Sequence, residues 1–223
     1  MNSSEYNIEL FSAVPSYIID DINRYGKIVK FYKNMPAMSS DDTLKYFYFV
    51  IEGRIKVFQF NFETSKEQTI KILSRGDMFD VIVLMDDQPH DVITHTYEDS
   101  KVLQVPIDVV REWIDKNSEF RKLMFRYIAA EMRSLEELAT DLSLLDTSTR
   151  FIKLLLKHFD KNRAKLKLIH DLPHEEIASL IGTVRHVVNR HIQELKKEGT
   201  LHVERKKLKL QDISRLIDRV QLK

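Results

Sequence analysis

The sequence of 223 residues contains no cysteine, only five glycines and one tryptophan. The absence of cysteine excludes disulfide bonds, thiolate-bound zinc and cysteine-held iron–sulfur clusters. No apolar run approaches the ~18 residues that a membrane-spanning helix needs. The first residues, MNSSEYNIELF, lack the basic and apolar segments of a signal peptide. We therefore expect a cytoplasmic protein that makes no membrane contact.

The net charge of +1 conceals two parts of opposite charge. Residues 1–145 carry 17 Lys and Arg against 24 Asp and Glu, a net charge of −7. Residues 146–223 carry 18 against 10, a net charge of +8, and six of the eight histidines. This asymmetry predicts that only the C-terminal part binds a polyanion.

The pattern of apolar residues divides the chain into a helical start, a β-rich middle and a helical end. Residues 5–26 predict a helical lead-in, with Pro15 suited to a helix start. Residues 27–106 hold short runs rich in Val, Ile, Phe, Tyr and Thr, separated by turns: KIVKFY, YFYFVI, RIKVFQFNF, EQTIKIL, HDVITHTY and KVLQVP. Such spacing is typical of a small all-β roll or barrel. Residues 108–117 then predict a short helix.

A long helix is expected from Ser118 to about Asp146. Its apolar residues follow a 3.5-residue repeat over three heptads, broken once by Glu131. A helix of ~28 residues is ~40 Å long, more than a small sensor domain covers along a narrow stripe. We therefore favour pairing with a second copy over packing of the helix on its own β domain. The predicted dimer seam consists of Met124, Ile128, Leu135, Leu138, Leu142 and Leu145.

Residues 172–199, LPHEEIASLIGTVRHVVNRHIQELKKEG, predict two short helices joined by a turn at Gly182. One face of the second helix is apolar, with Val184, Val187, Val188, Ile192 and Leu195. The other face carries Arg185, His186, Asn189, Arg190 and Gln193. Arg and Asn have the bidentate geometry that fits guanine and adenine edges in the major groove. LHVER and KKLKLQD then predict a two-stranded wing, which favours a DNA-reading module over a merely solvated helix face.

The order of helix, β-roll, long helix and winged helix-turn-helix resembles the Crp/Fnr family of bacterial transcription regulators over nearly the whole chain. Four segments carry the resemblance: LFSAVP, FVIEGRIKVF, RGDMF and EEIASLIGTVRHVVNRHIQELKKEGTL. It implies an α+β fold with a double-stranded β-helix or jelly-roll sensor domain, a dimerisation helix and a winged helix-turn-helix. The expected boundaries are 1–117, 118–146 and 147–223. The implied partners are palindromic double-stranded DNA, a second copy of the chain and RNA polymerase.

The resemblance also assigns roles on the second helix of the motif. Arg185 and Arg190 match positions that contact guanines, and Asn189 matches a position that varies between subgroups. His186 stands where the family commonly has Glu, so the half-site is expected to differ at that base pair. The expected base contacts are Arg185, His186, Asn189 and Arg190. The expected phosphate contacts are His174, Thr183, Lys206 and Lys207.

The segment that matches the family's cyclic-nucleotide cassette departs from the family pattern. Members that bind cyclic AMP follow the Gly-Asp turn with a small residue and Glu, then an Arg-Ser pair. Here no Arg or Lys occurs between Arg75 and Lys101, and Asp residues crowd the segment. Carboxylates repel a cyclic phosphate, so we expect an effector other than cyclic AMP. The expected effector pocket comprises Phe79, Asp80, His90 and His95.

Several alternatives stay open. We predict no cofactor, but some relatives in the family bind haem and respond to carbon monoxide or nitric oxide, and His90 and His95 flank the cassette. A small organic ligand, or regulation by abundance alone, is also compatible with the sequence. A different class is a β-roll signalling module that does not bind DNA. An enzyme is not expected, because no nucleophile–base pair, phosphate-cradling glycine loop or HExxH metal motif is present.

Overall fold

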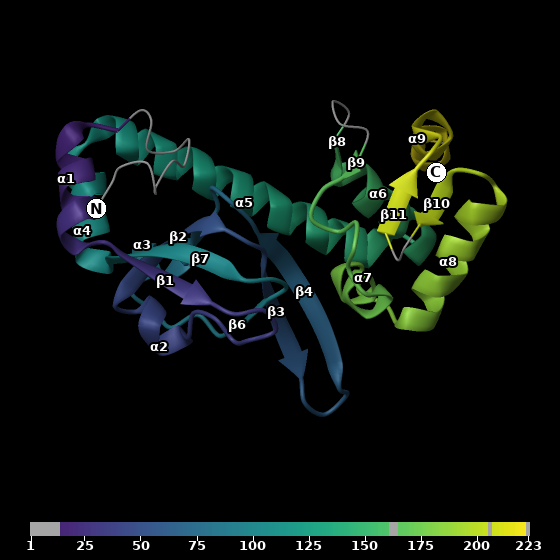
Figure 1. The fold of residues 1–223 in the computed structure, drawn as a ribbon, viewed down its shortest axis with the longest axis horizontal. Helices are drawn as coiled ribbons and strands as arrows, with labels where there is room; N and C mark the ends of the chain where they lie inside the picture. Colours follow the sequence, from purple (N-terminus) through teal and green to yellow (C-terminus); the bar gives the residue numbers. More distant parts are fainter. Residues whose placement is uncertain (1–13, 161–164, 205–206, 222–223) are drawn as a thin grey trace. The chain divides into compact units, whose positions relative to one another are not determined.

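The computed structural model describes residues 14–160, 165–204 and 207–221 (Figure 1). The chain forms two compact units, one of Met1–Gln59 with Lys71–Ser134, the other of Phe60–Ile70 with Leu135–Lys223. These units differ from the three predicted domains, because the long helix is shared between them and a hairpin tip joins the C-terminal unit. Every helix of the described residues is too short or too polar to span a bilayer.

The predicted β-rich region is confirmed, and each of its six runs contains a strand. Helix α1 (Ser16–Tyr25) begins after Pro15, as expected, and the lead-in before residue 14 lies outside the described residues. The six strands are β1 (Lys27–Phe31), β2 (Tyr46–Glu52), β3 (Ile55–Asn61), β4 (Lys66–Leu73), β6 (Ile93–Thr96) and β7 (Ser100–Pro106). Three short elements were not predicted: α2 (Ser40–Thr43), β5 (Met78–Phe79) and α3 (Val81–Asp86).

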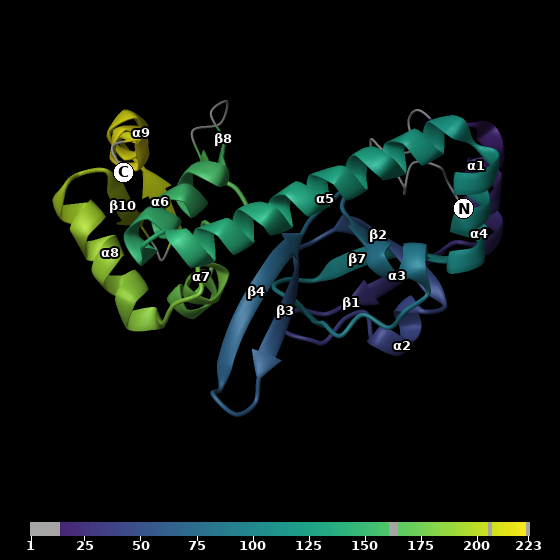
Figure 2. The ribbon, with the colours of Figure 1, turned by 180° about the vertical axis from the view of Figure 1, so that it is seen from behind.

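The strands form a four-stranded sheet in the order β1-β7-β2-β5 and a three-stranded sheet in the order β4-β3-β6. Figure 2 shows β3 and β4 side by side as a hairpin. Strand β2 is buried on both faces, because Phe47 and Phe49 pack with the helices while Tyr48 and Val50 pack with residues of both sheets. This explains why YFYFVI is continuously apolar instead of alternating.

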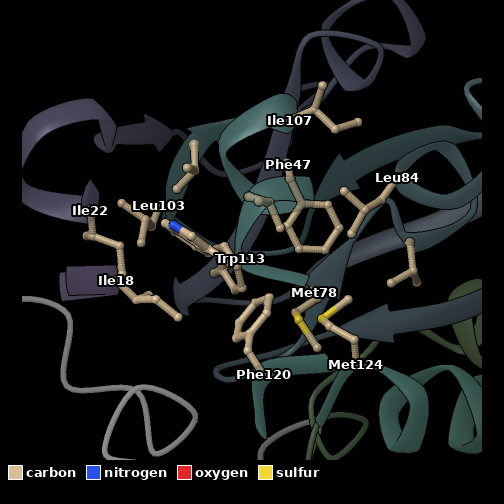
Figure 3. Close-up of a cluster of buried hydrophobic side chains, with 14 of the residues drawn as sticks. Ile18, Ile22, Phe47, Met78, Leu84, Leu103, Ile107, Trp113, Phe120 and Met124 are labelled. Carbon is tan, nitrogen blue, oxygen red and sulfur yellow. The ribbon is translucent and has the colours of Figure 1, made fainter. Parts of the chain in front are cut away.

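The core of the N-terminal unit lies between the four-stranded sheet and the helices α1, α4 (Ile107–Lys116) and α5 (Ser118–Leu144). Figure 3 shows Trp113 at the centre of this cluster. The ring of Trp113 meets Phe120 edge-on at 5.6 Å between centroids, and its Nε1–H donates to Asp21 Oδ2 at 2.9 Å. The one tryptophan is thereby packed and satisfied, and it provides a spectroscopic probe of this unit alone.

The structure corrects the predicted seam on α5. Met124 is 0% exposed and belongs to the core of its own unit (Figure 3), so its assignment to a dimer seam is wrong. Glu131, the break in the repeat, forms an ion pair with Lys71 of β4. The row that holds Met124 and Glu131 therefore faces the β-roll. The exposed apolar residues on this stretch of α5 are Phe125, Met132 and Leu135, exposed by 59%, 66% and 44%.

The C-terminal unit contains the winged helix-turn-helix predicted from the sequence. Helix α6 (Thr147–Lys157) is capped by Asp146, whose Oδ1 accepts from the Thr149 N–H at 2.8 Å. The other elements are β8 (Phe159–Asp160), β9 (Lys165–Leu166), α7 (His174–Leu180), α8 (Arg185–Lys197), β10 (Leu201–Glu204), β11 (Lys207–Leu210) and α9 (Ile213–Gln221). Strands β10 and β11 pair antiparallel as the wing. Residues 165–172, KLKLIHDL, begin with the alternation of a strand, but β9 covers only the first two of them.

His158, which caps the end of α6, predicts how this unit responds to acid. Burial, with a smaller contribution from Lys157, lowers the pKa of His158 to about 4 from its ordinary value of 6.5. A lowered folded-state pKa gives stability that is complete above pH 6.5 and is lost as the pH falls toward 4. The unit should therefore lose about 2 kcal/mol of unfolding free energy between pH 7 and pH 5 from this residue.

His158→Gln should remove this part of the acid sensitivity, whereas His186→Gln, at an exposed site on α8, should keep it. Urea unfolding followed by far-ultraviolet circular dichroism measures the change, and Trp113 fluorescence separates the unfolding of the N-terminal unit. Equal pH dependence in the wild type and His158→Gln would contradict the assignment.

Candidate nucleic-acid interface

The turn between α7 and α8 requires glycine at position 182. Gly182 has φ +62°, and a Cβ built there would lie 2.5 Å from Leu142 Cδ2 and 3.0 Å from Gln68 Oε1. The Thr183 N–H closes the turn by donating to the Ala178 carbonyl at 2.9 Å. The left-handed backbone strains any residue other than glycine, and a side chain here would also have to displace the ends of the Leu142 and Gln68 side chains, so glycine favours this form of the connection between the two helices.

Helix α8 is fixed to its unit by one buried face. Val188, Ile192 and Leu195 are at most 2% exposed, as the periodicity predicted. His191 is also buried, with its ring stacked on Phe151 at 6.2 Å and its Nε2 within 3.0 Å of Thr147 Oγ1. These contacts tie α8 to α6.

The predicted apolar face fails at one position. Val184 is 47% exposed, because it is the N-cap residue with extended backbone and lies outside the helical turn that the periodicity assumes. Gly199 ends α8: it follows the C-cap Glu198 and has φ +74°.

The opposite face of α8 presents its polar side chains to solvent. Arg185 and Arg190 have 63% and 64% of their side-chain surface exposed, and His186 and Gln193 are exposed too. Each arginine has a nearby carboxylate: Arg185 lies 3.6 Å from Glu175, and Arg190 lies 3.8 Å from Glu194. Exposed pairs of this kind contribute at most about 1 kcal/mol, so a stronger acceptor readily replaces the carboxylate.

Asn189 and His174 meet each other across the motif. His174 is the first residue of α7, and its Nδ1 forms a hydrogen bond with Asn189 Oδ1 on α8. Both side chains are partly buried. The sequence had assigned them separately, one to phosphate and one to base, and a pair fifteen residues apart leaves no periodic signal.

The expected phosphate contacts are only partly described. Thr183 is partly buried in the turn, and Lys207 is exposed at the start of β11. Lys206 lies outside the described residues. Lys196 and Lys197 add exposed positive charge in the last turn of α8, where cations favour the helix dipole.

Helix α7 has a further anchor that the sequence did not reveal. Ser179 Oγ accepts from the Thr69 N–H at 2.9 Å, and the two hydroxyls lie 2.7 Å apart. Both residues are buried. Residues 60–70 of the β3–β4 hairpin thus belong to the same compact unit as α7. A Ser and a Thr 110 residues apart give no sequence signal of such a contact.

At the predicted effector pocket, two of the four residues come together. Asp80 is 4% exposed, accepts from the Ile82 N–H at the start of α3, and is hydrogen-bonded to His90 Nδ1. This bond raises the pKa of His90 above its usual value, against an opposing effect of burial. Phe79 instead packs in the core at 3% exposure, and His95 lies on β6 opposite Lys56. No hydrogen bond or ion pair between described residues joins either of them to Asp80.

Polar side chains from α4 and α5 also contact this segment. Arg111 of α4 donates to the carbonyls of Val83 and Leu84 at 3.2 Å and pairs with Asp87. Tyr127 of α5 donates its hydroxyl to the Met78 carbonyl at 3.1 Å and accepts from the Met78 N–H at 2.9 Å. Burial raises the pKa of Tyr127, so the phenol stays protonated.

A further polar contact of α5 is the ion pair between Lys71 and Glu131, the charged residue in its apolar repeat.

Among the described residues, no three His, Cys, Asp or Glu side chains gather as a metal site. His90 and His95 are the histidines of residues 1–145, and the Nδ1 of His90 is engaged by Asp80. As an iron ligand, His90 could therefore offer its Nε2.

Comparison with known families gives two matches along the chain. A family model for a cyclic nucleotide-binding domain matches residues 28–117. A model for a Crp-like helix-turn-helix domain matches residues 149–219. The matches fall on the β-rich region and on the winged helix-turn-helix, respectively.

Similar proteins extend along most of the chain. A CRP-like cAMP-activated global transcriptional regulator of Mycobacterium tuberculosis is 24% identical over 216 residues, covering 95% of this chain and 96% of the relative. A global nitrogen regulator of Nostoc is 24% identical over 184 residues, covering 80% and 82%.

Solved structures share the fold. A CooA mutant from Carboxydothermus hydrogenoformans aligns with a TM-score of 0.76 at 21% identity, covering 99% of this chain and 97% of that one. FixK2 from Bradyrhizobium japonicum aligns with a TM-score of 0.74 at 18% identity, covering 86% and 96%.

Proposed function

This chain belongs to the Crp/Fnr family of transcription regulators, and we propose that it acts as a homodimer that binds a palindromic DNA site. The observation that carries the proposal is helix α8, with one face buried and two exposed arginines on the other. The net charge of +8 on residues 146–223 supports contact with a polyanion. Such a protein works in the cytoplasm beside its DNA and passes its signal to RNA polymerase.

Helix α8 enters the major groove in this proposal. Arg185 and Arg190 exchange their weakly held carboxylates for guanine edges, and His186 faces the base pair where the half-site differs from the family's usual one. Lys207 contacts the phosphate backbone, which positions the protein without reading sequence. Two copies place their α8 helices in half-sites about 34 Å apart.

Replacing one arginine and one lysine separates base reading from phosphate contact. Arg190→Ala should weaken binding to the preferred site by about 1–3 kcal/mol and relax the preference at one base pair. Lys207→Ala should weaken binding to preferred and scrambled DNA by the same factor, and reduce the salt dependence of log K by about one phosphate contact. Fluorescence anisotropy with both duplexes at several salt concentrations measures these effects.

Equal losses on both duplexes for both variants would show that the two roles are wrongly divided. If the wild type bound preferred and scrambled duplexes alike, the proposal of sequence-specific binding would fail. In that case the alternative, a β-roll module that does not read DNA, would take its place.

The exposed stripe on α5 supports the homodimer. Phe125 and Met132 lie seven residues apart, and Leu135 lies on the adjoining turn. Pairing of this stripe with its copy would remove large apolar side chains from water at about 25 cal/mol per Å². The seam thus stays a prediction for Ile128, Leu135, Leu138, Leu142 and Leu145, and we extend it to Phe125 and Met132.

A charge placed on this stripe should separate the subunits. Met132→Lys should shift the protein toward monomer, because a lysine would be buried between two helices without a partner. Ala130→Lys is the matched control, since Ala130 is exposed on the other side of α5 and should leave the dimer intact. Sedimentation velocity at micromolar concentration measures both. A wild-type monomer, or equal behaviour of the two variants, would contradict the seam.

We infer that the effector is not cyclic AMP, although one relative is described as cAMP-activated. Asp80 holds a buried carboxylate in the cassette, and its partner is already His90. Arg111 of α4, which contacts the end of α3, is engaged by two carbonyls and by Asp87. A cyclic phosphate would have to displace these partners and approach a carboxylate of the same charge.

Calorimetric titration with cyclic AMP should give no binding heat at micromolar concentrations, and the DNA affinity should be the same with and without it. A micromolar dissociation constant would contradict the inference. An absorption spectrum of the purified protein tests the haem alternative in parallel, because bound haem gives a Soret band.

A further inference from the structure

The first turn of α7 contacts two residues of α8 that lie one helical turn apart. His174 holds Asn189, and the adjacent Glu175 lies 3.6 Å from Arg185. The two contacts differ in burial: Glu175 and Arg185 are 69% and 63% exposed, whereas His174 and Asn189 are partly buried. The His174–Asn189 pair therefore restrains a side chain on the reading face more firmly than the ion pair beside it.

The atoms in this contact define which group Asn189 shows to DNA. The amide oxygen Oδ1 only accepts hydrogen bonds, so His174 Nδ1 carries the proton and donates to it. The amide nitrogen Nδ2, with its two N–H donors, then points away from His174. Among the described residues, no side chain or carbonyl accepts a hydrogen bond from Nδ2.

We propose that His174 is a positioning residue for base readout, which makes Asn189 a donor-only contact that selects guanine and rejects adenine. Guanine presents two acceptors, N7 and O6, on its major-groove edge. Adenine pairs with a free amide through one donor and one acceptor. Here the acceptor, Oδ1, is turned toward His174 by the hydrogen bond between the two side chains. This inference rests on the proposed DNA-binding function.

The proposal changes the role that the sequence gave His174. A residue that only contacts phosphate affects all sequences alike. A residue that orients Asn189 affects one base pair and leaves the others unchanged. These two roles give different results when binding is measured on a set of sites.

The experiment selects bound DNA from a random pool with the full-length wild type, then measures affinity for sites altered at one position. Asn189→Ala first identifies the base pair whose preference depends on Asn189. At that position the wild type should favour guanine over adenine on the same strand by about fivefold or more, the lower end of one base contact.

His174→Ala should reduce that ratio to about twofold or less, because the released amide turns and accepts from adenine. Preferences at other positions should persist. Glu175→Gln is the matched control in the same turn and should leave the ratio unchanged. The double variant of His174→Ala and Asn189→Ala should match Asn189→Ala at this position.

Asn189→Asp gives a second test, in which the side chain at position 189 can still accept the hydrogen bond from His174. One carboxylate oxygen stays with His174 and the other faces DNA as an acceptor, so guanine should be rejected in favour of cytosine, whose N4 donates.

Three results would overturn the proposal: a wild-type preference for adenine at this position, no preference that depends on Asn189, or an equal loss for all four bases in His174→Ala. If the wild type selected no sequence at all, the proposed function itself would fail, which is a distinguishable outcome.

Discussion

The burial of one face of α8 is the constraint on which DNA recognition depends. Val188, Ile192 and Leu195 are almost completely removed from solvent, and each such side chain contributes about 1.5–3 kcal/mol. His191 adds a polar link to α6 through Thr147, so the helix cannot rotate without leaving a buried imidazole unpaired. The polar face is presented in a fixed register because the opposite face has no freedom to turn.

In the β-roll, polar side chains around α3 form hydrogen bonds with other groups of the same unit. Asp80 is paired with His90, Arg111 with the end of α3, and Tyr127 with the backbone of Met78. The sheets that frame the segment are built from apolar residues and are independent of which ligand, if any, is recognised.

Regular periodicity explains what could be predicted from the sequence. The six runs of Val, Ile, Phe and Tyr became strands, and the 3.6-residue repeat placed α8 with the correct exposed face. Met124 was assigned to the wrong partner, because a heptad repeat marks an apolar stripe without stating whether the own core or a second chain covers it. Val184 failed because capping ends the helical geometry on which the repeat depends.

Contacts between residues far apart in the chain were beyond prediction. Thr69 meets Ser179, Lys71 meets Glu131, and His174 meets Asn189 through single polar atoms. Each pair becomes visible only when the fold brings its elements together. Of these six residues, Glu131 alone stood out in the sequence, because it is a charged residue within an apolar stripe.

In the proposed role of His174, base recognition by this protein depends on a residue of α7 as well as on α8. Grafting α8 alone onto a related scaffold would transfer Asn189 without His174. The transplanted helix would keep its sequence, but its Asn189 side chain would no longer be oriented by His174. The effect of a substitution at Asn189 on the target site would likewise depend on whether His174 is present. The preference for a target site would thus depend on the first helix of the motif as well as on the second.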